Sequence, residues 1–263
     1  APSAYFVGIA AIICSGIILK KTKLFAGDPA PFVMELPAYH MPTAVNVLRS
    51  MWERGWSFIK KAGTVILLST IFIWFTSSFG FADGSFGMVE DLSDGILASI
   101  GRGIAWIFAP LGWGNWQAAV AAITGLVAKE NVVGTFGILY GFAEVAEDGQ
   151  EIWGTLAGSF TAVSAYSFLV FNLLCAPCFA AMGAIKREMN NARWTWFAIG
   201  YQTVLAYGVS LCIYQLGSWF ETGSFGIGTA AAIILVALFI YLLIRPYRES
   251  RFLNVGLKAK SAV

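Results

Sequence analysis

The segment from Gly228 to Ile244 reads GTAAAIILVALFIYLLI and contains no charged residue. A helix needs about 20 mostly apolar residues to cross the hydrocarbon of a bilayer, and this segment approaches that length. Four other stretches have the same character, and none shows the alternation of a membrane-spanning strand. We therefore expect membrane-spanning helices at Ala4–Leu19, Ala62–Phe79, Leu156–Ala181, Trp196–Leu216 and Gly228–Ile244.

The composition of the 263-residue chain also indicates a membrane protein. Hydrophobic residues make up 58% and charged residues only 12%, about half of the roughly 25% that a soluble domain carries. The net charge of +2 is too small for a nucleic-acid-binding protein, and four cysteines do not form a disulfide framework. The first residues, Ala1-Pro2-Ser3, lack the form of a signal peptide, so we expect the interior of a longer protein.

The charges predict which side of the membrane each loop faces. Basic residues cluster in three regions, 20–61, 186–193 and 245–260, which hold 15 of the 17 in the chain. Because basic residues resist translocation, these regions and the C-terminus should be cytoplasmic. The loops 82–95 and 141–155, together with Glu221, contain nine acidic residues and no basic one, and should face outside.

Three further segments complete the expected architecture. Ile96–Leu111 and Trp116–Tyr140 form either two antiparallel crossings or a re-entrant hairpin, because both flanking loops should lie outside. Met41–Lys61 has one charged and one apolar face, as an interfacial amphipathic helix does, and it leads directly into the second span. A plain cytoplasmic linker helix fits it equally well. The predicted fold is an all-α, polytopic helical bundle with about five to seven transmembrane or re-entrant helices.

Two ionisable residues, Lys129 and Glu130, lie inside the apolar segment Trp116–Tyr140. Such residues are costly in a span and persist where they are paired or line a cavity. Gly125, Gly134 and Gly137 allow the helix to break, and broken helices build ion and substrate sites in transporters. The alternative is a packing role, with both residues at the membrane edge or paired with Arg102 or with each other.

A second polar stripe lies in the predicted span Leu156–Ala181. Helical spacing places Ser164, Ser167, Cys175 and Cys178 on one face, and Pro177 should free the carbonyl of residue 173. Thiolates suit Fe, Zn or Cu(I) far better than Na⁺, Mg²⁺ or Ca²⁺. A redox pair and simple packing of small residues are the alternatives. The candidate metal ligands are Cys178, Cys175 and Glu130, and the pore-lining candidates are Ser164, Ser167, Asn172 and Lys129.

The remaining chemistry of the sequence argues against an enzyme. No nucleotide-binding loop, zinc-protease helix or serine-hydrolase elbow is present. Cys14 and Cys212 are lone thiols in apolar spans, typical of packing residues, and His40 is the sole histidine. We therefore expect no catalytic residue and no cofactor bound by this chain.

Several motifs in order resemble one family. They are Met34-Glu35-Leu36-Pro37, the segment 52–64 (WERGWSFIKKAGT), Ala128-Lys129-Glu130 followed by Gly134-Thr135, Pro177-Cys178 and the segment 184–188 (AIKRE). Together they resemble the C-terminal membrane half of the bacterial ferrous-iron transport protein B (FeoB) family. The resemblance covers nearly the whole chain and fades in the acidic loops and after Arg251. Asn131 departs from the small apolar residue that is usual there.

The resemblance implies the membrane permease portion of a GTP-dependent Fe²⁺ uptake transporter in the bacterial inner membrane. It implies a linker region at 1–54, a second gate (nucleoside-recognition) module at 55–187, two transmembrane helices at 188–245 and a basic tail at 246–263. The first gate and the GTPase that uses GTP and Mg²⁺ lie outside this chain, which looks like a fragment or one half of a split protein. Cys178 corresponds to the Pro-Cys cysteine suspected of meeting iron, and Glu130 to the glutamate of Ala-Lys-Glu.

The expected partners are Fe²⁺, the lipid bilayer, the missing gate and GTPase, and a small cytoplasmic accessory protein; a homo-oligomer is also compatible. Two other functions compete. A nucleoside symporter would share the gate module, and a non-transporting membrane scaffold would dock partners through the basic tail and the interfacial helix.

Overall fold

A computed structural model describes residues 2–22, 25, 43–82, 85–89, 91–126, 129, 131–140 and 152–246. Glu130, His40, the Met-Glu-Leu-Pro motif and most of the acidic loops and basic tail lie outside the described residues. The chain divides into two compact units, residues 1–53 with 234–263 and residues 54–233.

The smaller unit contains α1 (Pro2–Lys20) and the C-terminal part of α10 (Ile227–Ile244). Each forms as a helix where the sequence predicts an uninterrupted apolar run. The ammonium group of Lys21, just after α1, donates a hydrogen bond to the carbonyl of Leu243 near the end of α10. A cation at a helix C-terminus interacts favourably with its unpaired carbonyls.

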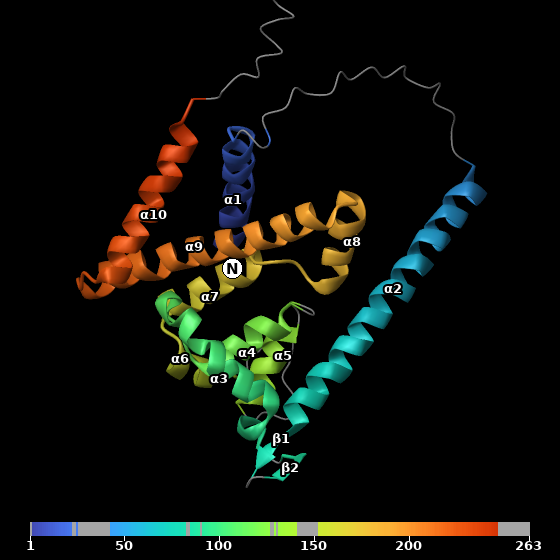
Figure 1. Cartoon of the computed structure of the whole chain (residues 1–263), viewed down its shortest axis with the longest axis horizontal. Helices are drawn as coiled ribbons and strands as arrows, with labels where there is room; N and C mark the ends of the chain where they lie inside the picture. The colour runs from blue at the N-terminus through green and yellow to red at the C-terminus, as the bar shows by residue number, and fades with distance from the viewer. Residues whose placement is uncertain are drawn as a thin grey trace, which may run out of the picture. The chain divides into compact units, whose positions relative to one another are not determined.

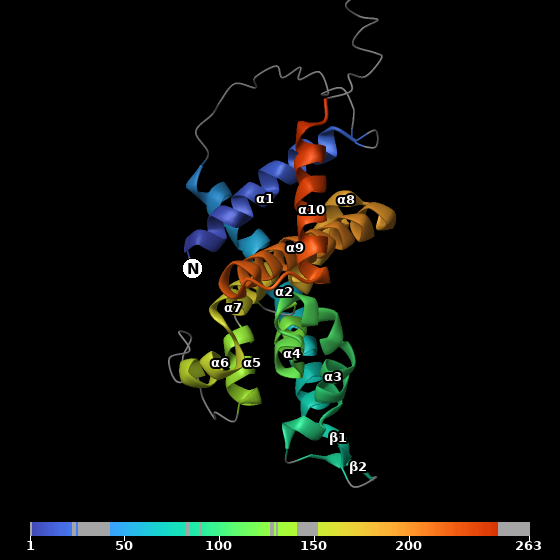
Figure 2. The same cartoon turned by 90° about the vertical axis from the view of Figure 1, so that its left-hand side faces the viewer.

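The amphipathic segment and the second predicted span form one continuous helix, α2 (Ala44–Ser78). Arg49 pairs with Glu53 one turn later at 3.1 Å, on an exposed face. A hairpin of two short antiparallel strands, β1 (Phe79–Ala82) and β2 (Ser85–Met88), follows α2 directly (Figure 2). The prediction contained no strand here, because the two strands are only four residues long.

Membrane-spanning character is confirmed in the described residues. Three helices are long and apolar enough to cross a bilayer: α1, α9 (Ala192–Thr222) and α10. Two bent pairs qualify only when each pair is taken together. In the first, α3 (Ile96–Phe108) with η2 (Ala109–Leu111) meets α4 (Trp116–Thr124) at 97°; in the second, α6 (Trp153–Ser159) meets α7 (Ala162–Leu174) at 102°.

The predicted span over Leu156–Ala181 is therefore not one continuous helix. The chain turns at Thr161, whose side chain accepts a hydrogen bond from the amide of Ser164 and begins α7. α7 then ends at Leu174, and a new helix, α8 (Phe179–Met189), begins after Pro177. Similarly, Trp116–Tyr140 is divided into α4 and α5 (Asn131–Leu139). An N-cap and a proline outweigh the continuous apolar composition.

An aromatic cluster forms the core of the larger unit. Trp113, only 1% exposed, stacks on Phe108 with ring centroids 4.4 Å apart. It also meets the edge of Phe168 of α7 at 5.0 Å, and Phe168 lies 5.4 Å from Phe136 of α5. Aromatic rings at these separations pack tightly and favourably. The cluster therefore fixes α5 and α7 against the end of α3.

α9 is packed along α7 and the end of α3 (Figure 1). Gly217 allows close approach, because an added Cβ would lie 2.6 Å from Val163 of α7. Two α9 side chains donate to carbonyls at the end of α3 and in η2: Tyr207 to Ile107, and Gln215 to Pro110, both at 2.7 Å. Carbonyls that a helix end leaves without a partner are thus satisfied by α9.

Gly112 provides a test of this packing. It has φ of 87°, and an added Cβ would lie 2.1 Å from the ring of Tyr214 on α9. Gly223 also has positive φ, 68°, but open space around it. Gly223→Ala should cost about 1 kcal/mol, from backbone strain alone. Gly112→Ala should cost clearly more, measured by thermal unfolding in detergent. Equal losses in the two variants would contradict the described contact between η2 and α9.

Candidate functional site: two helix breaks that meet

Two interruptions of helical structure lie in the larger unit. The first break separates α4 from α5 and contains Gly125 to Glu130. The second break separates α7 from α8 and contains Cys175 to Cys178. Each break brings the carbonyl end of one helix next to the amide end of another. Inside a membrane every such group needs a partner, because lipid offers none.

A main-chain hydrogen bond joins the two breaks. The amide of Phe179, the first residue of α8, donates to the carbonyl of Leu126 at 3.1 Å. Amides in the first turn of a helix have no partner within the helix. The first break therefore supplies the acceptor that the start of α8 requires, although the two residues are 53 positions apart.

A side chain of the first break also reaches the end of α7. The ammonium group of Lys129 donates to the carbonyl of Leu173 at 3.3 Å. In a continuous helix that carbonyl would accept from residue 177, which is a proline and has no amide hydrogen. The sequence predicted the freed carbonyl at position 173, and the structure places the Lys129 ammonium beside it. Arg102, the other charged candidate for pairing, instead donates to the carbonyl of Ser93.

Close packing brings α4 next to α7 at the same level. An added Cβ on Gly125 would lie 3.2 Å from the Asn172 side-chain oxygen. The Asn172 side-chain nitrogen donates to the carbonyl of Phe168 at 2.9 Å, which directs the oxygen toward the first break. The hydroxyls of Thr124 and Thr135 lie 3.0 Å apart and join α4 to α5 across the break. Polar groups of three helices thus gather around the two breaks.

The two candidate thiols lie in the second break. Cys175 is buried, and its sulfur lies 3.5 Å from the Asn172 carbonyl oxygen. Cys178 is half-buried and precedes the first residue of α8. Because α7 ends at Leu174, helical spacing does not extend from Ser164 and Ser167 to the two cysteines. The prediction of one shared helical face is therefore wrong.

Ser164 and Ser167 lie within α7 and are fully buried. The Ser164 hydroxyl donates to the carbonyl of Thr161 within the first turn, at 3.0 Å. The Ser167 hydroxyl donates to the carbonyl of Ser210 on α9, at 3.1 Å. Both hydroxyls are thus occupied by backbone carbonyls, and Ser167 joins α7 to α9.

Glu130, the predicted carboxylate ligand, lies outside the described residues. Among the residues that the structure does describe, no group of three or more His, Cys, Asp or Glu side chains could hold a metal ion. The described part of the two breaks therefore contains three kinds of group that could bind a cation. They are two thiols, the Asn172 side-chain oxygen and the carbonyls of the helix ends.

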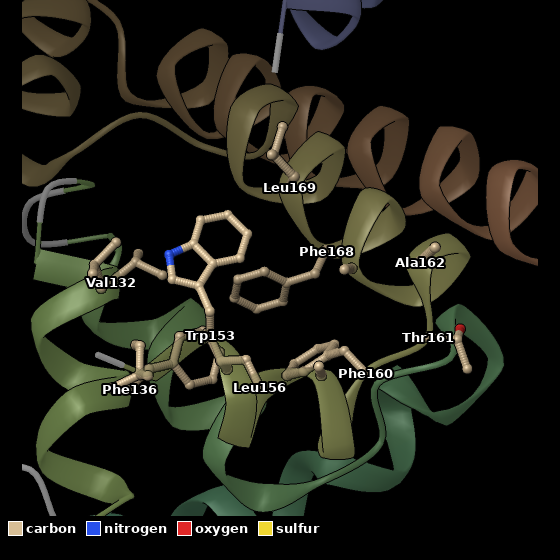
Figure 3. Close-up of a pocket in the computed structure, with 13 residues that line it drawn as sticks. Val132, Phe136, Trp153, Leu156, Phe160, Thr161, Ala162, Phe168 and Leu169 are labelled. Carbon is tan, nitrogen blue, oxygen red and sulfur yellow. The ribbon is translucent and has the colours of Figure 1, made fainter. Parts of the chain in front are cut away.

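An apolar cavity of about 570 Å³ lies between α5, α6 and α7 (Figure 3). Phe136, Phe160 and Phe168 line it, and Trp153 projects toward them. The polar side-chain groups among its lining residues are the Thr161 hydroxyl and the Trp153 indole. Such a lining offers too few ligands to replace the water shell of a divalent cation. The thiols and helix-end carbonyls described above lie at the breaks.

Comparison with known proteins assigns the family. A family model described as "Ferrous iron transport protein B C terminus" matches residues 1–54, and one described as "Nucleoside recognition" matches residues 59–192. The chain belongs to the FeoB family and contains part of its membrane region. Neither matched model is a GTPase domain.

Curated FeoB relatives agree with this assignment. The chain is 34% identical over 220 residues to the Fe(2+) transporter FeoB of Methanocaldococcus jannaschii, covering 82% of this chain and 32% of the relative. Against FeoB of Escherichia coli K12 the identity is 31%, covering 94% of this chain and 38% of the relative. The chain thus spans about a third of the length of these relatives. No solved structure matches it.

Several residues that join the helices of this FeoB region were not predicted from the sequence. The role of Thr124 was not predicted. Two hydroxyls in one apolar segment, Thr124 and Thr135, could have indicated a hydrogen bond between them. Tyr207 and Gln215 are polar residues in a predicted span, which favours helix-to-helix hydrogen bonds. The bond between Phe179 and Leu126 has no sequence signal, because both groups are main-chain atoms.

Replacing Phe179 tests the main-chain bond between the breaks. Proline is well tolerated at the first position of a helix, and Cys178 already has the extended backbone that precedes proline (φ −58°, ψ 158°). Phe179→Pro removes the amide hydrogen and leaves the Leu126 carbonyl unpaired. Phe179→Ala is the control that loses the ring and keeps the amide. The proline variant should be less stable than the alanine variant by about 1–3 kcal/mol in thermal unfolding. Equal stability would contradict the bond.

Proposed function

We propose that this region is the membrane permease portion of a GTP-dependent Fe²⁺ uptake transporter, and that Fe²⁺ passes the two helix breaks. The observation that supports this most is the direct hydrogen bond from the amide of Phe179, which follows Cys178, to the carbonyl of Leu126 in the first break. Fe²⁺ binds carboxylate, carbonyl and thiolate ligands. The described part of the breaks has carbonyls and two thiols, and the sequence adds the carboxylate of Glu130.

The proposed ligands are Cys178, Cys175 and Glu130, with Asn172 and Lys129 along the path. Ser164 and Ser167 contribute to the path only through helix packing, since their hydroxyls bind backbone carbonyls. Broken helices serve this role in other transporters, because their ends present carbonyls near the middle of the bilayer. Fe²⁺ would exchange its water for these groups one at a time.

Acidic residues would attract the cation from outside. Asp91 lies beside α3, in the region that we propose to be external. Hydrogen bonds from Ser93, first from its backbone amide and then from its side chain, lower the pKa of Asp91. The carboxylate therefore remains negatively charged as the pH falls below neutrality. A negative external surface raises the local concentration of cations.

The remaining parts of the proposal concern the whole protein. We place the chain in the bacterial inner membrane with its C-terminus in the cytoplasm, following the distribution of basic residues. A GTPase domain and a first gate module outside this chain would drive transport, with a small cytoplasmic accessory protein as a further partner. Within the chain, we propose a linker region at 1–54, the gate module at 55–187, two helices at 188–245 and a tail at 246–263.

A nucleoside substrate is the main competing proposal, since the matched gate model is described as "Nucleoside recognition". A ribose and a base present many hydrogen-bonding groups, which a binding site must satisfy. The described cavity between α5 and α7 offers only the Thr161 hydroxyl and the Trp153 indole. Its lining therefore favours a hydrocarbon-like content over a nucleoside.

Fe²⁺ uptake by variants of the proposed ligands tests the proposal. In the full-length protein that carries this region, Cys178→Ser and Glu130→Gln should each lower initial Fe²⁺ uptake about tenfold or more, because a weaker ligand replaces a thiolate or a carboxylate. Cys212→Ser is the matched control. Its sulfur donates a hydrogen bond to the Ala232 carbonyl between α9 and α10, and the uptake of this variant should equal that of the wild type.

Membrane expression has to be equal in all variants for the comparison to hold. Wild-type Fe²⁺ uptake in both Cys178→Ser and Glu130→Gln would contradict the site. Uptake of labelled uridine that depends on neither residue would favour the nucleoside symporter instead.

A further inference from the structure

We propose that Lys129 is a tethered cation that occupies the Fe²⁺ path at the end of α7, and that an entering divalent cation displaces it. This inference rests on the proposed function and concerns the selectivity of the same site. Its basis is the position of the Lys129 ammonium group, 3.3 Å from the carbonyl of Leu173. Leu173 lies in the last turn of α7, which leads to Cys175.

The Leu173 carbonyl lacks the main-chain donor that a continuous helix would supply and accepts from a cationic side chain instead. Pro177 removes the amide that a continuous helix would offer to it, and the helix ends one residue later. The carbonyl end of a helix also carries partial negative charge, which favours cations. The Asn172 carbonyl and the Cys175 sulfur lie 3.5 Å apart at the same helix end. A cation that replaced the ammonium would therefore have a thiol within the same turn.

The geometry of Lys129 suits a group that leaves. At 3.3 Å its hydrogen bond to Leu173 is longer than the 2.7–2.9 Å of a strong charge-assisted bond. The side chain is only half-buried, and its flexible stem allows the ammonium to move to a more hydrated position. Release of Lys129 therefore costs little, whereas burial without a partner would cost much.

A tethered monovalent cation selects against other monovalent cations. Na⁺ or K⁺ carries the same charge as the ammonium, but Lys129 is always present at high effective concentration because it is attached to the chain. A divalent cation interacts with the same carbonyl and thiolate about twice as strongly by Coulomb's law. Fe²⁺ can therefore displace Lys129, while Na⁺ and K⁺ cannot.

The alternative is that Lys129 serves only as a cap for α7. Capping would stabilise the protein, and its loss would lower thermal stability without improving cation binding. The two roles predict different results when the charge is removed: Fe²⁺ affinity rises if Lys129 occupies the cation position, and does not rise if Lys129 is only a cap. Lys129→Gln is the most informative change, because glutamine keeps a neutral donor for the Leu173 carbonyl and loses the positive charge.

Fe²⁺ binding under anaerobic conditions tests the inference in the full-length protein in detergent, by equilibrium dialysis. Lys129→Gln and Lys129→Met should bind Fe²⁺ about tenfold more tightly than the wild type at low salt. This gain should disappear as NaCl rises to physiological concentration, because Na⁺ now competes for the open position. Lys129→Arg should resemble the wild type. Lys186→Met, an exposed lysine of α8, is the matched control and should change nothing.

Unchanged or weaker Fe²⁺ binding in Lys129→Gln, with a thermal unfolding profile that reports a folded protein, overturns the inference. If Lys129→Met fails to fold, the glutamine variant alone decides. Fe²⁺ binding to Cys178→Ser distinguishes failure of the proposed iron site from failure of the inference about Lys129. Wild-type affinity in that variant overturns the proposed iron site and the inference with it. Reduced affinity there, together with no gain in Lys129→Gln, overturns the inference alone.

Discussion

Backbone groups at helix ends inside a bilayer must find partners within the protein, because lipid cannot supply them. In the larger unit several helix ends meet this requirement through residues distant in sequence. Tyr207 and Gln215 satisfy carbonyls at the end of α3 and in η2. Leu126 accepts from the start of α8, and Lys129 donates to the end of α7. The positions of the helices follow from these hydrogen bonds together with the aromatic cluster around Trp113.

The two hydrogen bonds between the breaks couple the movement of one break to that of the other. A movement that opened the first break would remove the acceptor of the Phe179 amide and the donor to the Leu173 carbonyl together. The second break, which holds both cysteines, would then have to rearrange as well. We propose that a gating signal from elsewhere in the FeoB polypeptide acts through this coupling, because packed helices switch between discrete arrangements.

The sequence was sufficient to predict the class of fold and two places where helical structure is interrupted. Apolar runs located α1, α9 and α10, glycines and a charged pair indicated the first break, and Pro177 indicated a freed carbonyl. The bend at Thr161 was not predicted, because apolar composition continues through it. The hairpin after α2 was not predicted, because its strands are only four residues long. The partners across the breaks were also not predictable, since a main-chain bond such as that of Phe179 leaves no trace in residue type.

The central claim is that groups of the second break, and Cys178 in particular, contact Fe²⁺ together with oxygen ligands of the first break. X-ray absorption spectroscopy on the Fe²⁺-loaded full-length protein examines this most directly, because it separates sulfur from oxygen or nitrogen neighbours of the metal. We expect a mixed sulfur and oxygen shell whose sulfur contribution falls in Cys178→Ser and whose oxygen contribution changes in Glu130→Gln. A shell of oxygen or nitrogen alone, identical in the wild type and both variants, would contradict it.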